Sequence, residues 1–306
     1  METLGHQPGR MNGGAPETGR HSRFTKEPEM TPVKHAAALF AVLMVLFFSA
    51  ALSAAESLHI TARSAILMDM TTDRILFAYN ADAPIQPASI TKVLSLYVAD
   101  EAIREGEVHP RDPVKISRQA GRTGGSRMYL EPGSKLPLEE LLKGMAVVSA
   151  NDASVAVAEH IGGGIEKFVE RMNRTARELG MYNSYFKNPN GLPAKGQVTT
   201  ARDILTLARA YLLQFPEALN IHSQQYYTYR KITQHNRNQL LRRYPNADGL
   251  KTGWVHKAGY HLVATAKRGD TRLIAVVMGA KNPDVRSQEA EQLLDEGFRI
   301  VQEKQG

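Results

Sequence analysis

Residues 250–279, LKTGWVHKAGYHLVATAKRGDTRLIAVVMG, decide the fold class of this chain. Residues 260–267 and 271–279 are mostly apolar and flank the turn sequence RGD at 268–270, which predicts two adjacent strands. Residues 250–255 predict a further short strand just before them. The sequence therefore predicts an antiparallel sheet in this part of the chain.

Two more strands are expected from a distant part of the sequence. Residues 64–70 (SAILMDM) and 74–79 (RILFAY) predict a pair of strands joined by a polar turn. Between the two regions, apolar residues recur at helical spacing over 89–104, 138–148, 152–161, 165–179 and 201–213, and a last amphipathic helix is expected at about 284–303. Strands at both ends with helices between them predict an α+β architecture, in which a helical lobe is inserted into one sheet and a ligand cleft lies between the two.

The first 55 residues differ in composition from the rest of the chain. Residues 1–35 are rich in Gly, Pro and charge without periodicity, which predicts a disordered N-terminal region. Residues 36–55 carry no charge and are long enough to span a bilayer, whereas the small Ser53 and Ala55 favour cleavage by a signal peptidase. We therefore expect a signal peptide, or alternatively an N-terminal membrane anchor, and a domain at 56–306 that works in the periplasm or cell envelope.

The composition also excludes several classes of function. The chain has no Cys, which excludes disulfides, thiolate catalysis and Cys-bound zinc. Its net charge of +7 is scattered and forms no Lys/Arg block, so no nucleic-acid partner is expected. His256 and His261 lie near Asp248 in the sequence, but no HExxH or similar ligand set is present, and no metal site is predicted. Three glycines at 162–164 lack the Lys-Ser/Thr of a phosphate loop and predict a flexible helix junction.

Ser89 and Lys92 are the first candidates for catalysis. They lie three residues apart at the start of a predicted helix, so the hydroxyl and the amine share one face. A lysine whose pKa falls well below its ordinary value can take the proton of such a hydroxyl and make it a nucleophile. The alternative is an N-cap serine with a solvated lysine, and the same spacing recurs at Ser184 and Lys187 in a polar segment.

Two further short motifs carry polar groups of the kind that a peptide substrate needs. Ser149 and Asn151 lie between two predicted helices, where a hydroxyl can relay a proton and a carboxamide can hold a substrate amide. In isolation, a helix N-cap by Asn151 or Asp152 is the more frequent role for such a stretch. Lys251-Thr252-Gly253 lies on the predicted strand at 250–255, where a cation and a hydroxyl can bind a carboxylate and a glycine lets a substrate strand approach.

The order of these three motifs resembles the signature of penicillin-binding proteins and class A β-lactamases. The flanking stretches PASITK, RMYLEPG, LLKGMAVVSANDAS, FKNPNGLP, HNRNQLL and DGLKTGWVHKAGYHLVATA are similar to the low-molecular-mass D-alanyl-D-alanine carboxypeptidases, peptidase family S11. The resemblance covers nearly all of residues 60–300. It implies the serine β-lactamase/D,D-peptidase-like transpeptidase fold, an α/β fold with a five-stranded antiparallel sheet flanked by helices and an all-helical subdomain.

The resemblance also implies a function. The domain at 56–306 would be a serine-type D-Ala-D-Ala carboxypeptidase that acts on peptidoglycan stem peptides in cell-wall synthesis and cell shape, needs no cofactor and is inhibited covalently by β-lactams. Carried over to this chain, Ser89 is the acylated nucleophile, Lys92 its proton acceptor and Ser149 a proton relay. The substrate would be bound by Asn151, by Lys251, Thr252 and Gly253, and by the backbone of Trp254, which would form the oxyanion hole with that of Ser89. No all-β C-terminal domain is expected, and any membrane attachment would come from residues 36–55.

Three alternatives and a few departures from the family pattern remain. A β-lactamase would need a deacylating carboxylate, but none of Glu159, Glu166, Glu170, Glu178 and Glu217 has the expected ExxLN-like context. A D,D-endopeptidase of the same family and a non-catalytic peptidoglycan-binding protein are the other two.

Val255 and His261 replace the Thr and Cys common in the family and can change substrate choice. Trp254 and the cluster of Tyr226, Tyr227 and Tyr229 are expected to pack and to form a cleft wall rather than bind nucleic acid.

Overall fold

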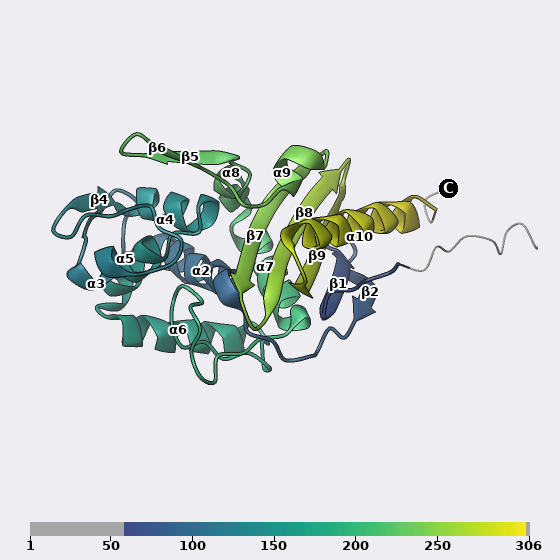
Figure 1. Ribbon diagram of the computed structural model, residues 1–306, viewed down its shortest axis with the longest axis horizontal. Helices are drawn as coiled ribbons and strands as arrows, with labels where there is room; N and C mark the ends of the chain where they lie inside the picture. The colour runs from purple at the N-terminus through teal and green to yellow at the C-terminus, as the bar shows by residue number, and fades with distance from the viewer. Residues whose placement is uncertain (1–57, 304–306) are drawn as a thin grey trace, which may run out of the picture. The chain divides into compact units, whose positions relative to one another are not determined.

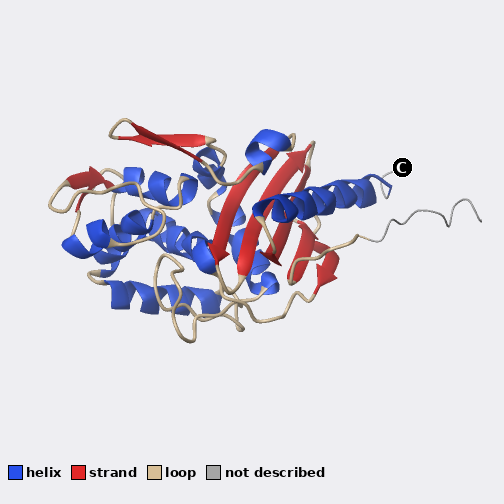
Figure 2. Ribbon diagram, in the orientation of Figure 1, coloured by secondary structure: helices blue, strands red, loops and turns tan. Residues whose placement is uncertain are grey.

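The computed structural model describes residues 58–303, and it contains the predicted five-stranded sheet (Figures 1 and 2). The strand order is β2-β1-β9-β8-β7, and every neighbouring pair is antiparallel. The strands are β1 (Ser64–Asp69), β2 (Arg74–Tyr79), β7 (Ala247–Val255), β8 (Gly259–Arg268) and β9 (Thr271–Ala280). The prediction of one sheet from two distant parts of the chain is confirmed, although β7 is longer than expected, with nine residues.

The six long helices lie within two residues of the predicted bounds, five of them in the middle of the chain and one at its C-terminal end. They are α2 (Thr91–Arg104), α4 (Leu138–Val147), α5 (Asn151–Gly162), α6 (Ile165–Glu178), α7 (Ala201–Gln214) and α10 (Pro283–Glu303). The junction predicted at the three glycines is confirmed, because α5 ends at Gly162 and Gly163 adopts a φ of 64° before α6 begins.

The sheet is covered on both faces. Helix α7 packs against β1 and β9, and α10 packs on β8, β9 and β1 from the opposite side (Figure 1). Side chains along β9 alternate between the two faces of the sheet and contribute to a hydrophobic core on each face. On one face they pack with the helical lobe and α7, and on the other with α10. The first face has Ile274, Val276 and Met278, and the second has Leu273, Ala275 and Val277. With both faces buried, the sheet is a rigid support for residues at the end of β7.

Several short elements were not predicted from the sequence, because three to five residues cannot show a helical or strand period. They are the pairs β3 (Pro113–Lys115) with β4 (Lys135–Pro137) and β5 (Tyr226–Tyr229) with β6 (Ile232–His235), the helices α3 (Arg118–Arg122), α8 (Leu219–His222) and α9 (Leu240–Arg243), and the 3₁₀ turns η1 (Ala88–Ile90) and η2 (Pro216–Ala218).

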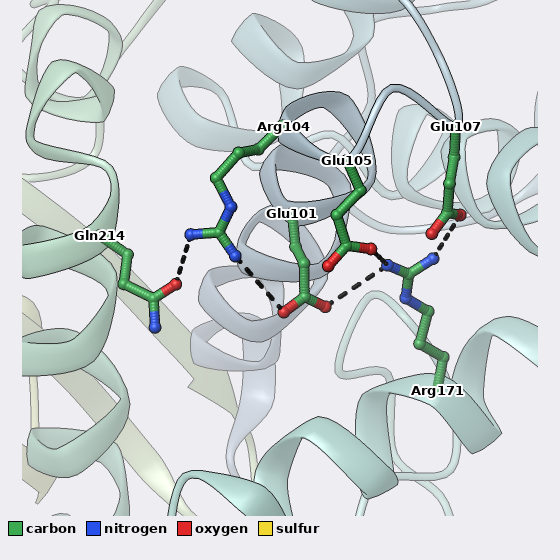
Figure 3. Close-up of polar contacts among 6 residues, drawn as sticks. All are labelled: Glu101, Arg104, Glu105, Glu107, Arg171 and Gln214. Carbon is green, nitrogen blue, oxygen red and sulfur yellow. Dashed lines mark hydrogen bonds and ion pairs between the residues drawn. The ribbon is translucent and has the colours of Figure 1, made fainter.

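A charged cluster holds two helices of the lobe together. Arg171 of α6 reaches Glu101 and Glu105 at 3.4 Å and Glu107 at 2.7 Å, all at the end of α2 or just after it (Figure 3). Because one guanidinium is shared by three carboxylates and is mostly buried itself, the cluster forms a network rather than a set of independent exposed pairs. It fixes the end of α2 that lies away from the candidate site.

The N-terminal predictions concern residues outside those that the structure describes. The disordered region at 1–35 and the signal peptide or anchor at 36–55 fall in this part and stay predictions. Over residues 58–303, no helix combines the length and the apolar character that crossing a membrane requires.

Candidate active site

Ser89 is the middle residue of the η1 turn, which leads directly into α2. The alternative of an N-cap serine is wrong, because no side chain caps either element. Ala88 adopts a φ of 49°, a costly conformation that persists only where neighbours enforce it. A Cβ on Gly191 would lie 1.8 Å from the Ala88 carbonyl oxygen, and one on Gly253 would lie 3.2 Å from the Ala88 Cβ. Two glycines therefore let a loop and strand β7 close around the turn that carries Ser89.

The amine of Lys92 has three oxygen atoms around it. Its Nζ lies 3.0 Å from Ser89 Oγ and donates to Asn151 Oδ1 and to the Asn190 carbonyl oxygen, both at 2.7 Å. The two amide oxygens can only accept, so they engage both hydrogens of a neutral amine. The lone pair of that amine is then left toward Ser89.

Burial lowers the pKa of Lys92 well below its ordinary value. The side chain is 0% exposed, so the charged form loses its hydration, and the positive charges of Lys251 and Arg237 lower the pKa further. The carboxylate of Asp152 acts in the opposite direction but is the weaker influence. The site can therefore hold Lys92 as a neutral amine, which is the form that accepts a proton.

Asn151 begins α5 and connects two parts of the site. Besides accepting from Lys92, its Nδ2 donates to the Gly124 carbonyl oxygen at 2.8 Å, and its backbone N–H donates to the Ser126 carbonyl at 2.7 Å. The N-cap position belongs to Ala150, so the alternative of a cap by Asn151 or Asp152 is wrong. The role of Asn151 in binding the substrate backbone stays a prediction, since its carboxamide is already engaged with Lys92 and Gly124.

Asp152 is a positioning residue for which the sequence analysis considered only the role of a helix cap. Its buried carboxylate accepts from the backbone N–H groups of Met128 and Leu130, at 3.1 and 3.0 Å. These bonds hold the loop whose Gly125 and Ser126 line the site. The only sequence signal was an acidic residue directly after Asn151 at the start of a helix.

Ser149 lies on the same wall as Asn151. It adopts a φ of 62° between α4 and α5, is almost fully buried and lines the same cleft as Ser89. The structure thus brings together the two serines, as the sequence predicted. The proton relay through Ser149 stays a prediction.

Strand β7 forms the opposite wall. Thr252, Gly253 and Trp254 line the cleft, and Trp254 is 53% exposed with its ring centre 5.8 Å from that of Tyr260. Lys251 was expected at the cleft edge, but it is buried and not among the lining residues; its Nζ donates to the Thr252 carbonyl oxygen at 3.0 Å. Burial, together with the charges of nearby arginines, lowers the pKa of Lys251 to about 7.

Three arginines to which the sequence analysis assigned no role line the cleft: Arg237, Arg242 and Arg286. The cleft has a volume of about 830 Å³, and Arg237 and Arg286 lie along it. Arg286 is buried, donates to the Arg237 carbonyl oxygen at 3.3 Å, and has its pKa lowered to about 10 by burial. Within residues 58–303 it forms no ion pair with a carboxylate. Arg237 belongs to the family-like stretch HNRNQLL at 235–241. No sequence motif indicated Arg286, because α10 reaches the cleft only in the folded chain.

The two departures from the family pattern lie in different places. Val255 lines the cleft, so it can contact a ligand. His261 is fully buried and does not line the cleft, so a change of substrate choice by direct contact is not available to it.

The candidates for a metal site do not gather: His256 lines the cleft, whereas His261 and Asp248 do not. Asp248 pairs with Arg272 at 2.8 Å, and no three His, Asp or Glu side chains of residues 58–303 gather where they could bind one metal ion. The second S-x-x-K match is separate, since Ser184 Oγ donates to Asp203.

The tyrosine cluster does not line the cleft, although Tyr226 packs on His235, which does. Tyr227 donates to Glu140 of α4 at 2.7 Å, and Tyr226 is exposed on strand β5. Neither they nor Tyr229 line the cleft, so the expected cleft wall is wrong for them, whereas it is confirmed for Trp254.

Comparison with known proteins identifies the family to which this geometry belongs. The model of the peptidase S11 family, D-alanyl-D-alanine carboxypeptidase, matches residues 51–282. The chain belongs to this family. It is similar to D-alanyl-D-alanine carboxypeptidase DacC of Escherichia coli, with 41% identity over 81% of this chain and 64% of the relative. The chain thus spans less than two thirds of the length of that relative.

Solved structures agree with this assignment. Penicillin-binding protein 5 of Haemophilus influenzae is 40% identical, with a TM-score of 0.77 over 79% of this S11 chain and 72% of the other. Penicillin-binding protein D2 of Listeria monocytogenes, solved in an ampicillin-bound form, is 28% identical with a TM-score of 0.72, over 78% of this chain and 98% of that one. The five-stranded sheet with its helices is therefore the fold of the penicillin-binding D,D-peptidases, as the sequence predicted.

Proposed function

We propose that this S11 chain is a serine D,D-carboxypeptidase that removes the terminal D-alanine from peptidoglycan pentapeptides through an acyl-enzyme on Ser89. The observation that carries the proposal is the contact of Ser89 Oγ with Lys92, whose neutral amine would have both hydrogens engaged by amide oxygens. Membership of the family supplies the substrate class.

In the acylation step, Ser89 Oγ attacks the carbonyl carbon of the penultimate D-alanine and its proton moves to Lys92 Nζ. The peptide C–N bond breaks when the nitrogen of the terminal D-alanine takes up a proton, which Ser149 relays from Lys92. Water then attacks the ester in the same way, and Ser89 regains its proton. Gly253 packs on Ala88 and Ile90, which supports an oxyanion hole made of the backbone N–H groups of Ser89 and Trp254.

The free carboxylate of the substrate would be bound on the β7 wall. Thr252 lines that wall with Arg237 and Arg286, and Lys251 lies directly behind it. A carboxylate placed there forms charge-assisted hydrogen bonds and raises the pKa of Lys251 from about 7, so the lysine becomes charged when substrate binds. The cations thereby select peptides with a free C-terminus.

The same site would accept β-lactams, which present an amide and a carboxylate in a similar arrangement. The Listeria relative was solved with ampicillin bound. In this chain, the carboxylates that could serve as a deacylating base lie outside the residues that line the cleft: Glu159, Glu166, Glu170, Glu178 and Glu217. We therefore expect a long-lived penicilloyl adduct rather than the turnover of a β-lactamase.

We also propose that the enzyme is exported and works in the periplasm or cell envelope. The uncharged segment at 36–55, ending in Ser53 and Ala55, supports export by signal peptide or anchor. Mass spectrometry of the mature N-terminus tests this: a start at Glu56 supports a cleaved signal, and an intact N-terminus in membrane fractions supports an anchor.

The experiment for the activity is a product assay with the purified chain and a Ser89→Ala control. A monomeric pentapeptide ending in D-Ala-D-Ala should lose one alanine with wild type and none with the variant. A cross-linked peptide dimer tests the endopeptidase alternative in parallel, because its cleavage releases two stem peptides. Binding of either substrate without any product would instead support a non-catalytic peptidoglycan-binding protein.

A further inference from the structure

His261 lies in β8 with its imidazole behind the turn that carries Ser89. It pairs with Gly253 of β7 on one side and with Met278 of β9 on the other. Directly paired residues point to the same face of a sheet, so the imidazole shares the face on which Gly253 packs against Ala88 and Ile90. It is 0% exposed and does not line the cleft.

Two backbone groups determine the tautomer of this imidazole. The N–H of Gly279 donates to Nδ1 at 2.9 Å, and Nε2 lies 3.0 Å from the Gln86 carbonyl oxygen. Because a carbonyl can only accept, Nε2 carries the hydrogen, and Nδ1 is left bare to accept from Gly279. The neutral Nε2–H form therefore satisfies both contacts at once, whereas a protonated ring would set two N–H groups against each other.

The environment favours this neutral form at neutral pH. Burial lowers the pKa of His261 to about 4, the hydrogen bond to Gln86 acts against that shift, and the nearby charges of Arg286 and Arg63 lower the pKa further. At pH 7 the ring is therefore neutral, which is the form that both hydrogen bonds require.

His261 contacts the segment at 85–86, which lies directly before the strained backbone at Ala88. Ile85 is paired with Thr199 through two hydrogen bonds of 2.9 Å, Gln86 accepts from His261, and then Pro87 and Ala88 turn the chain to Ser89. The φ of 49° at Ala88 needs support from its neighbours, and Gln86 lies only two residues before it.

We propose that His261 is a positioning residue for acylation, which sets the turn of Ser89 through its hydrogen bond to the Gln86 carbonyl oxygen. The inference rests on the proposed acyl-enzyme. Its physical basis is that the contact connects the rigid centre of the sheet, β8 and β9, to the backbone of the nucleophile. A displacement of Ser89 of about 1 Å relative to Lys92 can lower a reaction rate on the order of 100-fold.

Two variants separate the hydrogen bonds that His261 makes. In His261→Gln, the side-chain amide reaches as far as Nε2 and can still donate to Gln86, but it gives up the acceptor for Gly279. In His261→Asn, the side-chain oxygen takes the place of Nδ1 and keeps the Gly279 contact, but the amide does not reach Gln86. Both place an uncharged carboxamide in the same buried site, so each serves as the control for the other.

The experiment measures acylation of each variant by benzylpenicillin as a function of drug concentration, with the melting temperature measured in parallel. We expect His261→Gln to acylate within about fivefold of wild type and His261→Asn to be slower on the order of 100-fold. The loss should appear in the rate at saturation and not in the apparent affinity, because the carboxylate-binding residues are unchanged. His261→Met fills the site but lacks both the donor to Gln86 and the acceptor for Gly279, so it should be as slow as His261→Asn. It takes the place of His261→Asn in the experiment if the asparagine variant does not fold.

Each other outcome overturns a defined part of the account. Equal acylation rates for His261→Gln and His261→Asn, or rates that simply follow the melting temperatures, would show that His261 only stabilises the fold. A wild type that is not acylated at all would overturn the proposed function itself, and with it the positioning role. Reduced apparent affinity at an unchanged saturating rate would place the effect of His261 on binding instead of on the turn.

Discussion

The two walls of the cleft satisfy their polar groups in different ways. On the wall of the helical lobe, Lys92 and Asn151 are held by protein oxygens at 2.7–2.8 Å, and Asp152 fixes the adjacent loop. On the wall of β7, the positively charged groups are Arg237, Arg286 and Lys251. Among the described residues, no Asp or Glu lines the cleft.

The difference indicates that the two walls have different functions. A wall whose hydrogen bonds are complete keeps one geometry, which is what proton transfer between Ser89 and Lys92 requires. On the β7 wall, Arg286 and Lys251 are buried without a carboxylate partner among residues 58–303, which disfavours their charged forms until an anion binds. The lobe wall should therefore determine the rate of the chemical step, and the β7 wall should determine affinity for the carboxylate.

The largest expected effect is on the lobe wall. Lys92→Arg keeps the charge but cannot deprotonate, so it should be as damaging as Lys92→Ala, with acylation slower by roughly 100- to 10,000-fold. Stopped-flow acylation by a chromogenic β-lactam measures this, and circular dichroism confirms the fold of each variant. Near-normal acylation of the arginine variant would mean that Lys92 acts by its charge and that the base lies elsewhere, with Ser149 as the first candidate.

A smaller and more selective effect is expected on the β7 wall. Lys251→Ala and Arg286→Met should each lower kcat/KM on a D-Ala-D-Ala peptide by roughly 10- to 100-fold, corresponding to about 1.5–3 kcal/mol for a hydrogen bond to a charged group. The matched substrate is the same peptide with its C-terminal carboxylate converted to an amide. Wild type and variants should differ little on the amide, and an equal loss on both substrates would refute the assignment of this wall to carboxylate binding.

The last expected effect is a gain in stability and not a change in activity. Lys251 is buried with a pKa of about 7 in the folded state, below its ordinary value of 10.5, so the unfolded chain binds more protons between these values and the stability of the wild type rises with pH across that window. Lys251→Met removes the buried ammonium and should raise the free energy of unfolding by roughly 2–4 kcal/mol at pH 7, since each pKa unit corresponds to about 1.4 kcal/mol.

Urea unfolding of both proteins at pH 7 and pH 10 tests this claim. The advantage of Lys251→Met should be largest at pH 7 and should shrink toward pH 10. A variant that is less stable than wild type at both pH values would mean that Lys251 is well compensated in the folded chain. Arg237→Met, on an exposed side chain of the same wall, is the control and should change stability little.

The sequence predicted those parts of the molecule that depend on local patterns. Apolar periodicity located the sheet and the six long helices, and the three motifs located Ser89, Lys92, Ser149, Asn151 and the residues of β7. The remainder depends on contacts between distant segments. Arg286 lines the cleft because it lies in the first turn of α10, which packs on β8 and β9, and the Asn190 carbonyl meets Lys92 across 98 residues of sequence.

Two features of the site show why a pattern could not reveal them. The positive φ of Ala88 is enforced by close contacts with Gly191 and Gly253, neither of which is its neighbour in the sequence. His261 differs from the residue common in the family, but only its contacts with Gln86 and Gly279 indicate that it acts on the nucleophile turn and not on the cleft.

The central claim is that Ser89 forms an acyl-enzyme, and intact-mass spectrometry after brief exposure to benzylpenicillin tests it most directly. The wild type should gain the mass of one penicillin, with the adduct mapped to Ser89 and persisting for minutes or longer, because the leaving amine stays tethered and, over residues 58–303, no Asp or Glu lines the cleft to activate water. Ser89→Ala should gain nothing. A wild type that neither gains this mass nor hydrolyses the drug would contradict the acyl-enzyme account, and rapid hydrolysis without a lasting adduct would make the protein a β-lactamase instead.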